Sequence, residues 1–158
     1  MPEKLIDDLL RQGKLKELKV AFIQIEELLQ ESIIDLQEAS KIQTIAQRAT
    51  YLMAYNAMLK AGRAILLLKG YTPSDGAQHK TVVIMTSHLL GPKFKNIVAH
   101  FEKMRVKRNM MTYEAHTLIS IVESKNAFKE AIELVQGIIK AVKIKNPQLE
   151  LDFNVDKL

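Results

Sequence analysis

Apolar residues recur at intervals of three and four along several long stretches of this chain, which is the spacing of one face of an α-helix. Two stretches show the spacing over many turns, one near each end of the sequence. Their apolar positions are Leu18, Phe22, Ile25, Leu29, Ile33 and Leu36 in the first stretch, and Leu118, Ile121, Phe128, Ile132, Val135, Ile139 and Val142 in the last. Long amphipathic helices bury such faces against one another, so the pattern predicts a helical bundle.

Glycine and proline divide the chain between these helices. Gly13 and Gly70 are expected to end helices, and Gly91-Pro92 breaks the chain again. The expected helices cover residues 3–12, 18–40, 42–69, 79–90, 94–113 and 115–143. We therefore expect an all-α fold, an antiparallel bundle of four to five main helices with a short N-terminal helix and no independent sheet.

The C-terminal tail, residues 146–158, has a different pattern. Asn146-Pro147 stops the last helix, and residues 149–156 alternate apolar with acidic or amide side chains, which is typical of a strand. Such a tail can lie extended along the body, pair with another chain, or fray. At 158 residues the whole chain, 1–158, is expected to form one domain with its core in about 14–145.

Composition excludes several classes of site. The chain has no cysteine, hence no disulfide or thiolate metal site, and no apolar run approaches the roughly 20 residues that span a bilayer. Acids stand near the N-terminus, where a signal peptide would carry basic residues. The four histidines (His79, His88, His100, His116) show no paired ligand spacing. We expect a cytoplasmic protein with no membrane segment, metal or cofactor.

Basic residues are concentrated in one helix. Between Lys93 and Arg108 there are six basic residues and one acid, and six minus one equals the net charge of the chain, +5. A patch of this kind attracts phosphate in a salt-dependent way, and the alternative is a solvated helix face. Lys14 lies far from this run in the sequence and is expected to contribute little to it.

One face of the same helix changes character midway. Its positions are Phe94, Val98, Phe101, Arg105, Arg108 and Thr112. The first three are apolar and the last three are polar. Buried polar groups are costly unless they are paired, so the stripe indicates either a polar site at this end of the helix or a helix end that leaves the core with its arginines in water.

The order of several short motifs resembles the HEPN family of small helical-bundle proteins. The resemblance spans about residues 28–139. The motifs are Ala54-Tyr-Asn-Ala-Met-Leu-Lys-Ala-Gly-Arg-Ala-Ile-Leu66, Lys69-Gly-Tyr-Thr-Pro73, Gln78-His-Lys-Thr81, and Arg105-Val-Lys-Arg-Asn109 with Tyr113.

The resemblance implies a bundle of four or five helices that usually forms a homodimer. In active members an arginine, four to six residues and a histidine form a metal-free ribonuclease site across the dimer. Many members belong to toxin–antitoxin, phage-defence or RNA-processing systems, often beside an antitoxin or a nucleotidyltransferase-like partner.

Arg108 matches the motif arginine, and Asn109 matches the polar residue after it. Tyr113 stands at the fifth position after Arg108, where active members have histidine, and His116 falls outside the motif's window. A tyrosine, with an ordinary pKa of about 10, is a poor general base at neutral pH. It can still hydrogen-bond a phosphate or stack on a base. With Arg108 and Tyr113 as the catalytic candidates, we therefore expect weak or absent cleavage.

The candidate site residues lie in the last three turns of this helix. We expect a pocket that binds RNA phosphate to be lined by Arg105, Arg108, Asn109 and Tyr113, with Lys103 and Lys107 on its rim. Two classes of function stay open. One is a HEPN-like homodimer that binds RNA or a nucleotide and is at most a weak or divergent ribonuclease of a toxin–antitoxin or defence type. The other is a non-catalytic protein-interaction module, in which the Arg/Asn/Tyr cluster is a structural network at the dimer interface.

Overall fold

The computed structural model describes residues 2–74, 79–151 and 153–158. The chain is 75% helical, which confirms the prediction of a mainly helical protein. Its elements in chain order are α1 (Pro2–Arg11), β1 (Leu15–Glu17), α2 (Phe22–Ile42), α3 (Gln47–Leu68), β2 (Tyr71–Pro73), α4 (His79–Leu90), the 3-10 turn η1 (Pro92–Phe94), α5 (Lys95–Tyr113), α6 (Ile121–Lys145) and the 3-10 turn η2 (Val155–Lys157).

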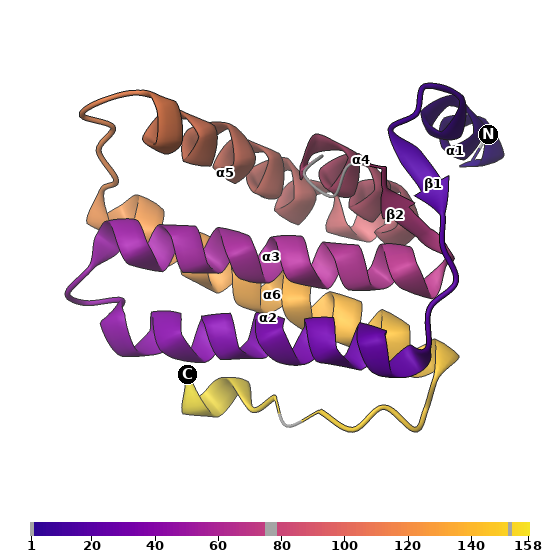
Figure 1. Cartoon of the computed structure of the whole chain (residues 1–158). Helices are drawn as coiled ribbons and strands as arrows, with labels where there is room; N and C mark the ends of the chain where they lie inside the picture. Colours follow the sequence, from indigo (N-terminus) through magenta and orange to yellow (C-terminus); the bar gives the residue numbers. More distant parts are fainter. Residues whose placement is uncertain (1, 75–78, 152) are drawn as a thin grey trace.

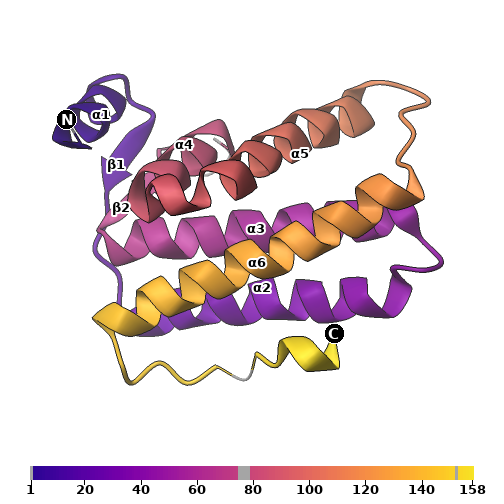
Figure 2. The same ribbon diagram turned by 180° about the vertical axis from the view of Figure 1, so that it is seen from behind.

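Helix α3 is the centre of the packing. It contacts α2 and α6 along its length, while α4 and α5 cover another side of it (Figure 1). Seen from behind, α6 lies across α2 and α3 (Figure 2). Ala57, Ala61 and Ala64 are fully buried on α3, and such small residues let neighbouring helices approach closely. The Ser32 hydroxyl donates a 2.7 Å hydrogen bond to the Ala57 carbonyl and ties α2 to α3.

A small sheet that the sequence analysis did not expect joins the beginning of the chain to the end of α3. β1 pairs antiparallel with β2, with Leu15 opposite Pro73 and Glu17 opposite Tyr71. Leu15 is buried, so the segment is fixed by packing as well as by its ladder. The expected start of a helix at Leu18 is wrong, because residues 15–17 pair with β2 and α2 begins at Phe22. The sheet holds the adjoining Lys14 near the start of α4.

The last helix also begins later than expected. Ser120 and Glu123 form a capping box, in which each side chain binds the other residue's backbone N–H, and α6 starts at Ile121. Leu118 is 81% exposed and does not belong to the buried seam. The seam is formed by Ser124, Ala127, Phe128, Ala131, Leu134, Val135, Ile138 and Val142.

The tail runs along the body of this chain beneath α2 (Figure 1). Leu149 is buried, and Phe153 and Leu158 pack against the core. The Ser40 hydroxyl donates a 3.0 Å hydrogen bond to the carbonyl of Leu158. Of the three arrangements considered for the tail, the structure has the extended one on its own body. The described residues contain no helix that combines the length and the apolarity needed to cross a membrane.

Candidate anion-binding site

Helix α5 changes from apolar to polar along one face, as the sequence predicts. Val98, Phe101 and Met104 are buried, and burying a side chain of this kind contributes roughly 1.5–3 kcal/mol, so they anchor the helix. Beyond them, the side chain of Arg105 is still only 16% exposed, whereas Tyr113 at the helix end is 82% exposed. The polar half of the face therefore emerges gradually from the core, and its arginines are placed at the boundary between protein and water.

The polar half of this face lines a cavity of about 510 Å³. It contains all four residues that the sequence analysis grouped together: Arg105, Arg108, Asn109 and Tyr113. The remaining lining residues come from two other parts of the chain. They are Lys14, which precedes β1, and His79, Lys80, Thr81 and Ile84 from α4. We call this the cationic cavity.

The charge of the cationic cavity is strongly positive. Lys14, Lys80, Arg105 and Arg108 contribute four positive charges, and no carboxylate is found among the described residues that line it. No carboxylate of the described residues forms an ion pair with Lys14, Lys80 or Arg108. Uncompensated cations facing one hollow are the electrostatic arrangement that attracts an anion.

Arg105 differs from the other three cations because it forms an ion pair with an acid, which none of the others does with any described residue. Its Nε donates to Oε2 of Glu102 at 2.9 Å, and its Nη2 donates to Oε1 at 2.6 Å. These hydrogen bonds hold the pKa of Glu102 below its ordinary value, so the carboxylate is ionised at neutral pH. Among the described residues, the four cations and this one acid beside the cavity leave an excess of three positive charges. Arg105 is thus fixed in orientation, and a ligand must share it with Glu102.

Arg108 has weaker partners. Its Nη1 donates to Oδ1 of Asn109 at 3.4 Å, and its backbone carbonyl accepts from the hydroxyl of Thr112 at 3.0 Å. Neither partner carries a charge that would compete with an anion. Because the guanidinium can donate several parallel hydrogen bonds to phosphate, Arg108 is the group in this cavity best suited to bind one.

A buried tyrosine supports the wall of the cationic cavity. Tyr55 on α3 is fully buried, and its ring lies 5.8 Å from the ring of Phe101. A 2.8 Å hydrogen bond joins its hydroxyl to Nδ1 of His79. Burial raises the pKa of Tyr55 above its ordinary value, against the opposing effect of Arg108 and Arg105. The hydroxyl therefore stays neutral, and it fixes the orientation of the His79 ring.

Lys103 and Lys107 do not stand on the rim of this cavity. They line a second cavity of about 420 Å³ between α5 and α6, which also contains Tyr51, His100, Met104, Glu123, Asn126, Ala127 and Glu130. We call it the paired cavity. Lys103 lies two residues from Arg105, which is about 200° around a helix, and Lys107 pairs with Glu123 on α6, so neither is among the residues that line the cationic cavity.

The basic groups of the paired cavity face acids. Nζ of Lys107 lies 2.7 Å from Oε2 of Glu123, and Nδ1 of His100 lies 2.6 Å from Oε1 of Glu130. The hydrogen bond from Lys107 lowers the pKa of Glu123. Burial raises the pKa of Glu130, opposed by His100. The two lysines of this cavity, Lys103 and Lys107, are thus matched by two carboxylates, Glu123 and Glu130, among the described residues that line it.

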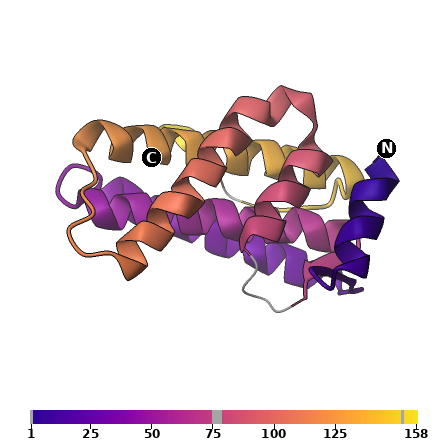
Figure 3. The ribbon, with the colours of Figure 1, turned by 90° about the horizontal axis from the view of Figure 1, so that it is seen from above.

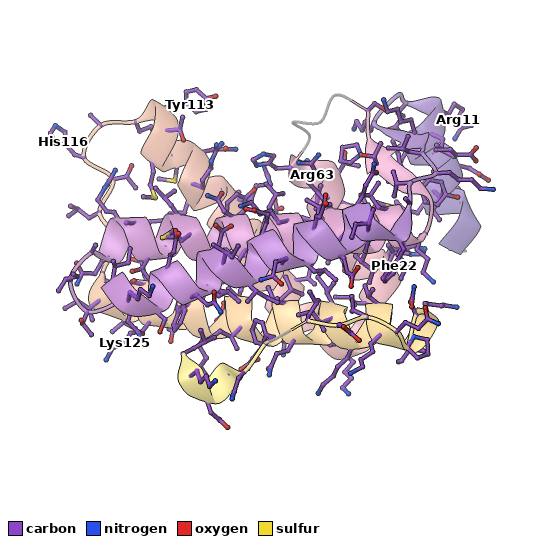
Figure 4. The ribbon with its side chains drawn as sticks, turned by 60° about the horizontal axis from the view of Figure 1, so that its bottom comes forward. Arg11, Phe22, Arg63, Tyr113, His116 and Lys125 are labelled. Carbon is purple, nitrogen blue, oxygen red and sulfur yellow. The ribbon has the colours of Figure 1, made fainter. Side chains whose placement is uncertain are left out.

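Tyr113 and His116 lie at the far end of α5 and in the loop that follows it (Figure 4). Tyr113 lines the cationic cavity. His116 is exposed, has a positive φ of 65° and is not among the residues that line either cavity. His116 is therefore not part of the cationic cavity or of the paired cavity.

Sequence reasoning missed the contribution of α4 and of Lys14 to this site. His79 and Lys80 belong to Gln78-His-Lys-Thr81, one of the motifs that carry the family resemblance, but the spacing of the histidines gives no sign of this site. Lys14 was placed outside the basic run, and the β1–β2 pairing brings it to the cavity. The motif gave a usable signal for His79 and Lys80, whereas nothing in the local sequence indicates where Lys14 lies.

Comparison of the chain with known protein families, with curated proteins and with solved structures finds no match. In the part of the chain that the structure describes, no three histidine, aspartate or glutamate side chains are grouped as a metal ion would require.

Proposed function

We propose that this protein binds RNA or a nucleotide through a phosphate held in the cationic cavity. The observation that carries the proposal is the convergence of Lys14, Lys80, Arg105 and Arg108 on one hollow without a lining carboxylate among the described residues. Phosphate contacts of this kind supply most of the sequence-independent affinity for nucleic acid. Arg108 is the principal ligand, and Asn109 and Tyr113 are neutral hydrogen-bonding groups beside it.

The wider proposal is a HEPN-like protein with an antiparallel helical arrangement that acts as a homodimer, in the setting of a toxin–antitoxin or defence system. Its support is the order of the sequence motifs, together with the cavity that contains Arg108, Asn109 and Tyr113. Dynamic light scattering tests the assembly, and a monomer at micromolar concentration contradicts it. We expect metal-free RNA cleavage to be weak or absent because Tyr113 is at the histidine position, and Tyr113→His is expected to raise it.

A second candidate is a protein-interaction module without catalytic activity. It is favoured by large apolar side chains that are exposed near the end of α5 and the start of α6. They are Val106, Met110, Leu118, Ile121 and Val122. In this alternative the Glu102–Arg105 pair and the Arg108–Asn109 contact orient a protein interface.

Binding of a fluorescein-labelled RNA oligonucleotide, followed by anisotropy, separates these two candidates. Arg108→Ala is expected to weaken binding by roughly 1–3 kcal/mol, the usual cost of losing charge-assisted hydrogen bonds. Lys143→Ala is the control, since Lys143 is exposed on α6 and lines neither cavity. Lys14 is unsuitable as a control because it lines the cationic cavity.

Salt provides an independent measurement of the same contact. Affinity is expected to fall steeply between low and moderate salt, and Arg108→Ala is expected to reduce the slope by about one. If the wild-type protein binds no RNA even at low salt, the proposal of RNA binding fails. The second candidate, a protein-interaction module, is then the function that the structure supports.

A further inference from the structure

A third cavity adjoins the cationic cavity on the same side of the molecule. It has a volume of about 520 Å³ and lies between α1, α4 and α5. Its apolar walls are formed by Leu5, Val83, Ile84, Val98 and Ala99. Val83 and Val98 are buried and belong to the core, whereas Ala99 is exposed at the opening. We call this the apolar cavity.

The apolar and cationic cavities are both lined by α4 and α5, which lie next to each other (Figure 3), and we call the two cavities together the groove. Lys80 and Ile84 line both of them. The Glu102–Arg105 ion pair lies at their junction, because Glu102 lines the apolar cavity and Arg105 lines the cationic one. A ligand that fills both would therefore pass beside this pair.

The apolar cavity also offers a small number of polar groups. Ser87 and His88 come from α4, and Lys95 and Glu102 come from α5. Apolar walls with a few polar groups are the usual composition of a small-molecule site. A nucleobase has this combination of a flat apolar body and a hydrogen-bonding edge, and a base that protein recognises in this way must be unstacked.

We propose that the apolar cavity binds the base of a nucleotide whose phosphate is held in the cationic cavity. The inference rests on the proposed function, and it adds that the ligand is a single strand with an accessible base. The two cavities adjoin at Lys80 and Ile84, and this favours an occupant with an apolar part and an anionic part over an unconnected apolar ligand. A duplex, in which the bases are stacked and paired, can fill only the cationic part.

The test compares an RNA pentanucleotide with its counterpart in which no sugar carries a base, using anisotropy at low salt. Removing the bases is expected to weaken binding to the wild-type protein by about tenfold, the order of magnitude of one base contact. Ala99→Leu adds bulk at the opening of the apolar cavity and is expected to weaken binding of the intact pentanucleotide by a similar factor. It should not affect binding of the abasic chain.

Ala115→Leu is the matched control, because Ala115 is exposed in the loop after α5 and lines neither part of the groove. The base subsite is overturned if intact and abasic chains bind equally, or if Ala99→Leu weakens both to the same extent. In either case a loss of binding in Arg108→Ala leaves the phosphate site standing. If Arg108→Ala binds both chains as the wild type does, the proposed function and the base subsite fail together.

Discussion

The cationic and paired cavities, which both lie against α5, each contain basic residues and differ in what faces those residues. In the paired cavity, Lys107 and His100 face Glu123 and Glu130 at ion-pair distance. In the cationic cavity, Arg108 has no acidic partner among the described residues, and only Arg105 has one, Glu102. An anion site is therefore defined by cations that the fold leaves without acids. A run of basic residues in a sequence does not by itself locate such a site.

Reversing one charge in each cavity is expected to give the largest difference in RNA affinity between the two cavities. Arg108→Glu is expected to lower the affinity for an RNA oligonucleotide by about 100-fold, because it removes a phosphate ligand and adds a repelling charge. Lys103→Glu, on the same helix but in the paired cavity, is expected to change it by less than about threefold, through net charge alone. Anisotropy measures both, and circular dichroism verifies that both variants fold. Equal losses in the two variants would remove the distinction between the cavities.

Neutralising one acid at each cavity is expected to give a smaller change in RNA affinity, and at the cationic cavity this change is an increase. Glu102→Gln leaves Arg105 without its ionised partner and removes a negative charge beside the cationic cavity, so RNA affinity is expected to rise by roughly three- to tenfold. Glu123→Gln makes the same chemical change in the paired cavity and is expected to leave the affinity unchanged. A decrease in the Glu102→Gln variant would mean that Glu102 positions Arg105 for the ligand more than it competes for it.

Tyr113 is expected to contribute little to binding. It lines the cationic cavity but is 82% exposed, and hydrogen bonds from so exposed a group add at most about 1 kcal/mol. Tyr113→Phe should therefore weaken RNA binding by less than about fivefold, well below the effect expected for Arg108→Glu. A loss as large as that of Arg108→Glu in the anisotropy assay would place Tyr113 at the centre of the site.

The alkaline limit of stability is expected to depend on the paired side of α5. Burial raises the pKa of Tyr51 to about 12, and Glu123 and Glu130 add to the rise. Because the unfolded chain ionises first, this contribution to stability is complete below the ordinary value of 10.0 and is lost as the pH rises toward 12. Tyr51→Phe should make the free energy of unfolding, measured in urea, fall less steeply over this range. An unchanged decline would contradict the burial of the hydroxyl.

Local sequence patterns predicted the helices and half of the site. The stripe from Val98 to Arg108 follows from helical spacing alone, and the structure gathers Arg105, Arg108, Asn109 and Tyr113 at one cavity. The same spacing places Lys103 on another face of the helix than Arg105, so the number of charges in a helix does not show which of them share a site. Ser120 and Glu123 have the spacing of a capping box, which predicts a helix start at Ile121, where α6 begins.

The other half of the site depends on contacts between distant parts of the chain. β1 is only three residues long and is defined by its pairing with β2, more than fifty positions later. That pairing is what brings Lys14 to the cationic cavity, and the packing of α4 beside α5 brings His79 and Lys80. No periodicity encodes such juxtapositions, because they are fixed by burial and by backbone hydrogen bonds that form only in the folded protein.

The most direct measurement is a titration of the ¹⁵N-labelled protein with a short single-stranded RNA, followed by NMR chemical shifts. We predict that the largest shifts occur at the backbone amides of Lys80, Arg105, Arg108 and Asn109 and at the Arg108 side chain, with little change at Lys107 and Glu123. Largest shifts around Lys107 and Glu123, or no shifts at low salt, would contradict the claim that the fold leaves its anion site on the cationic side of α5.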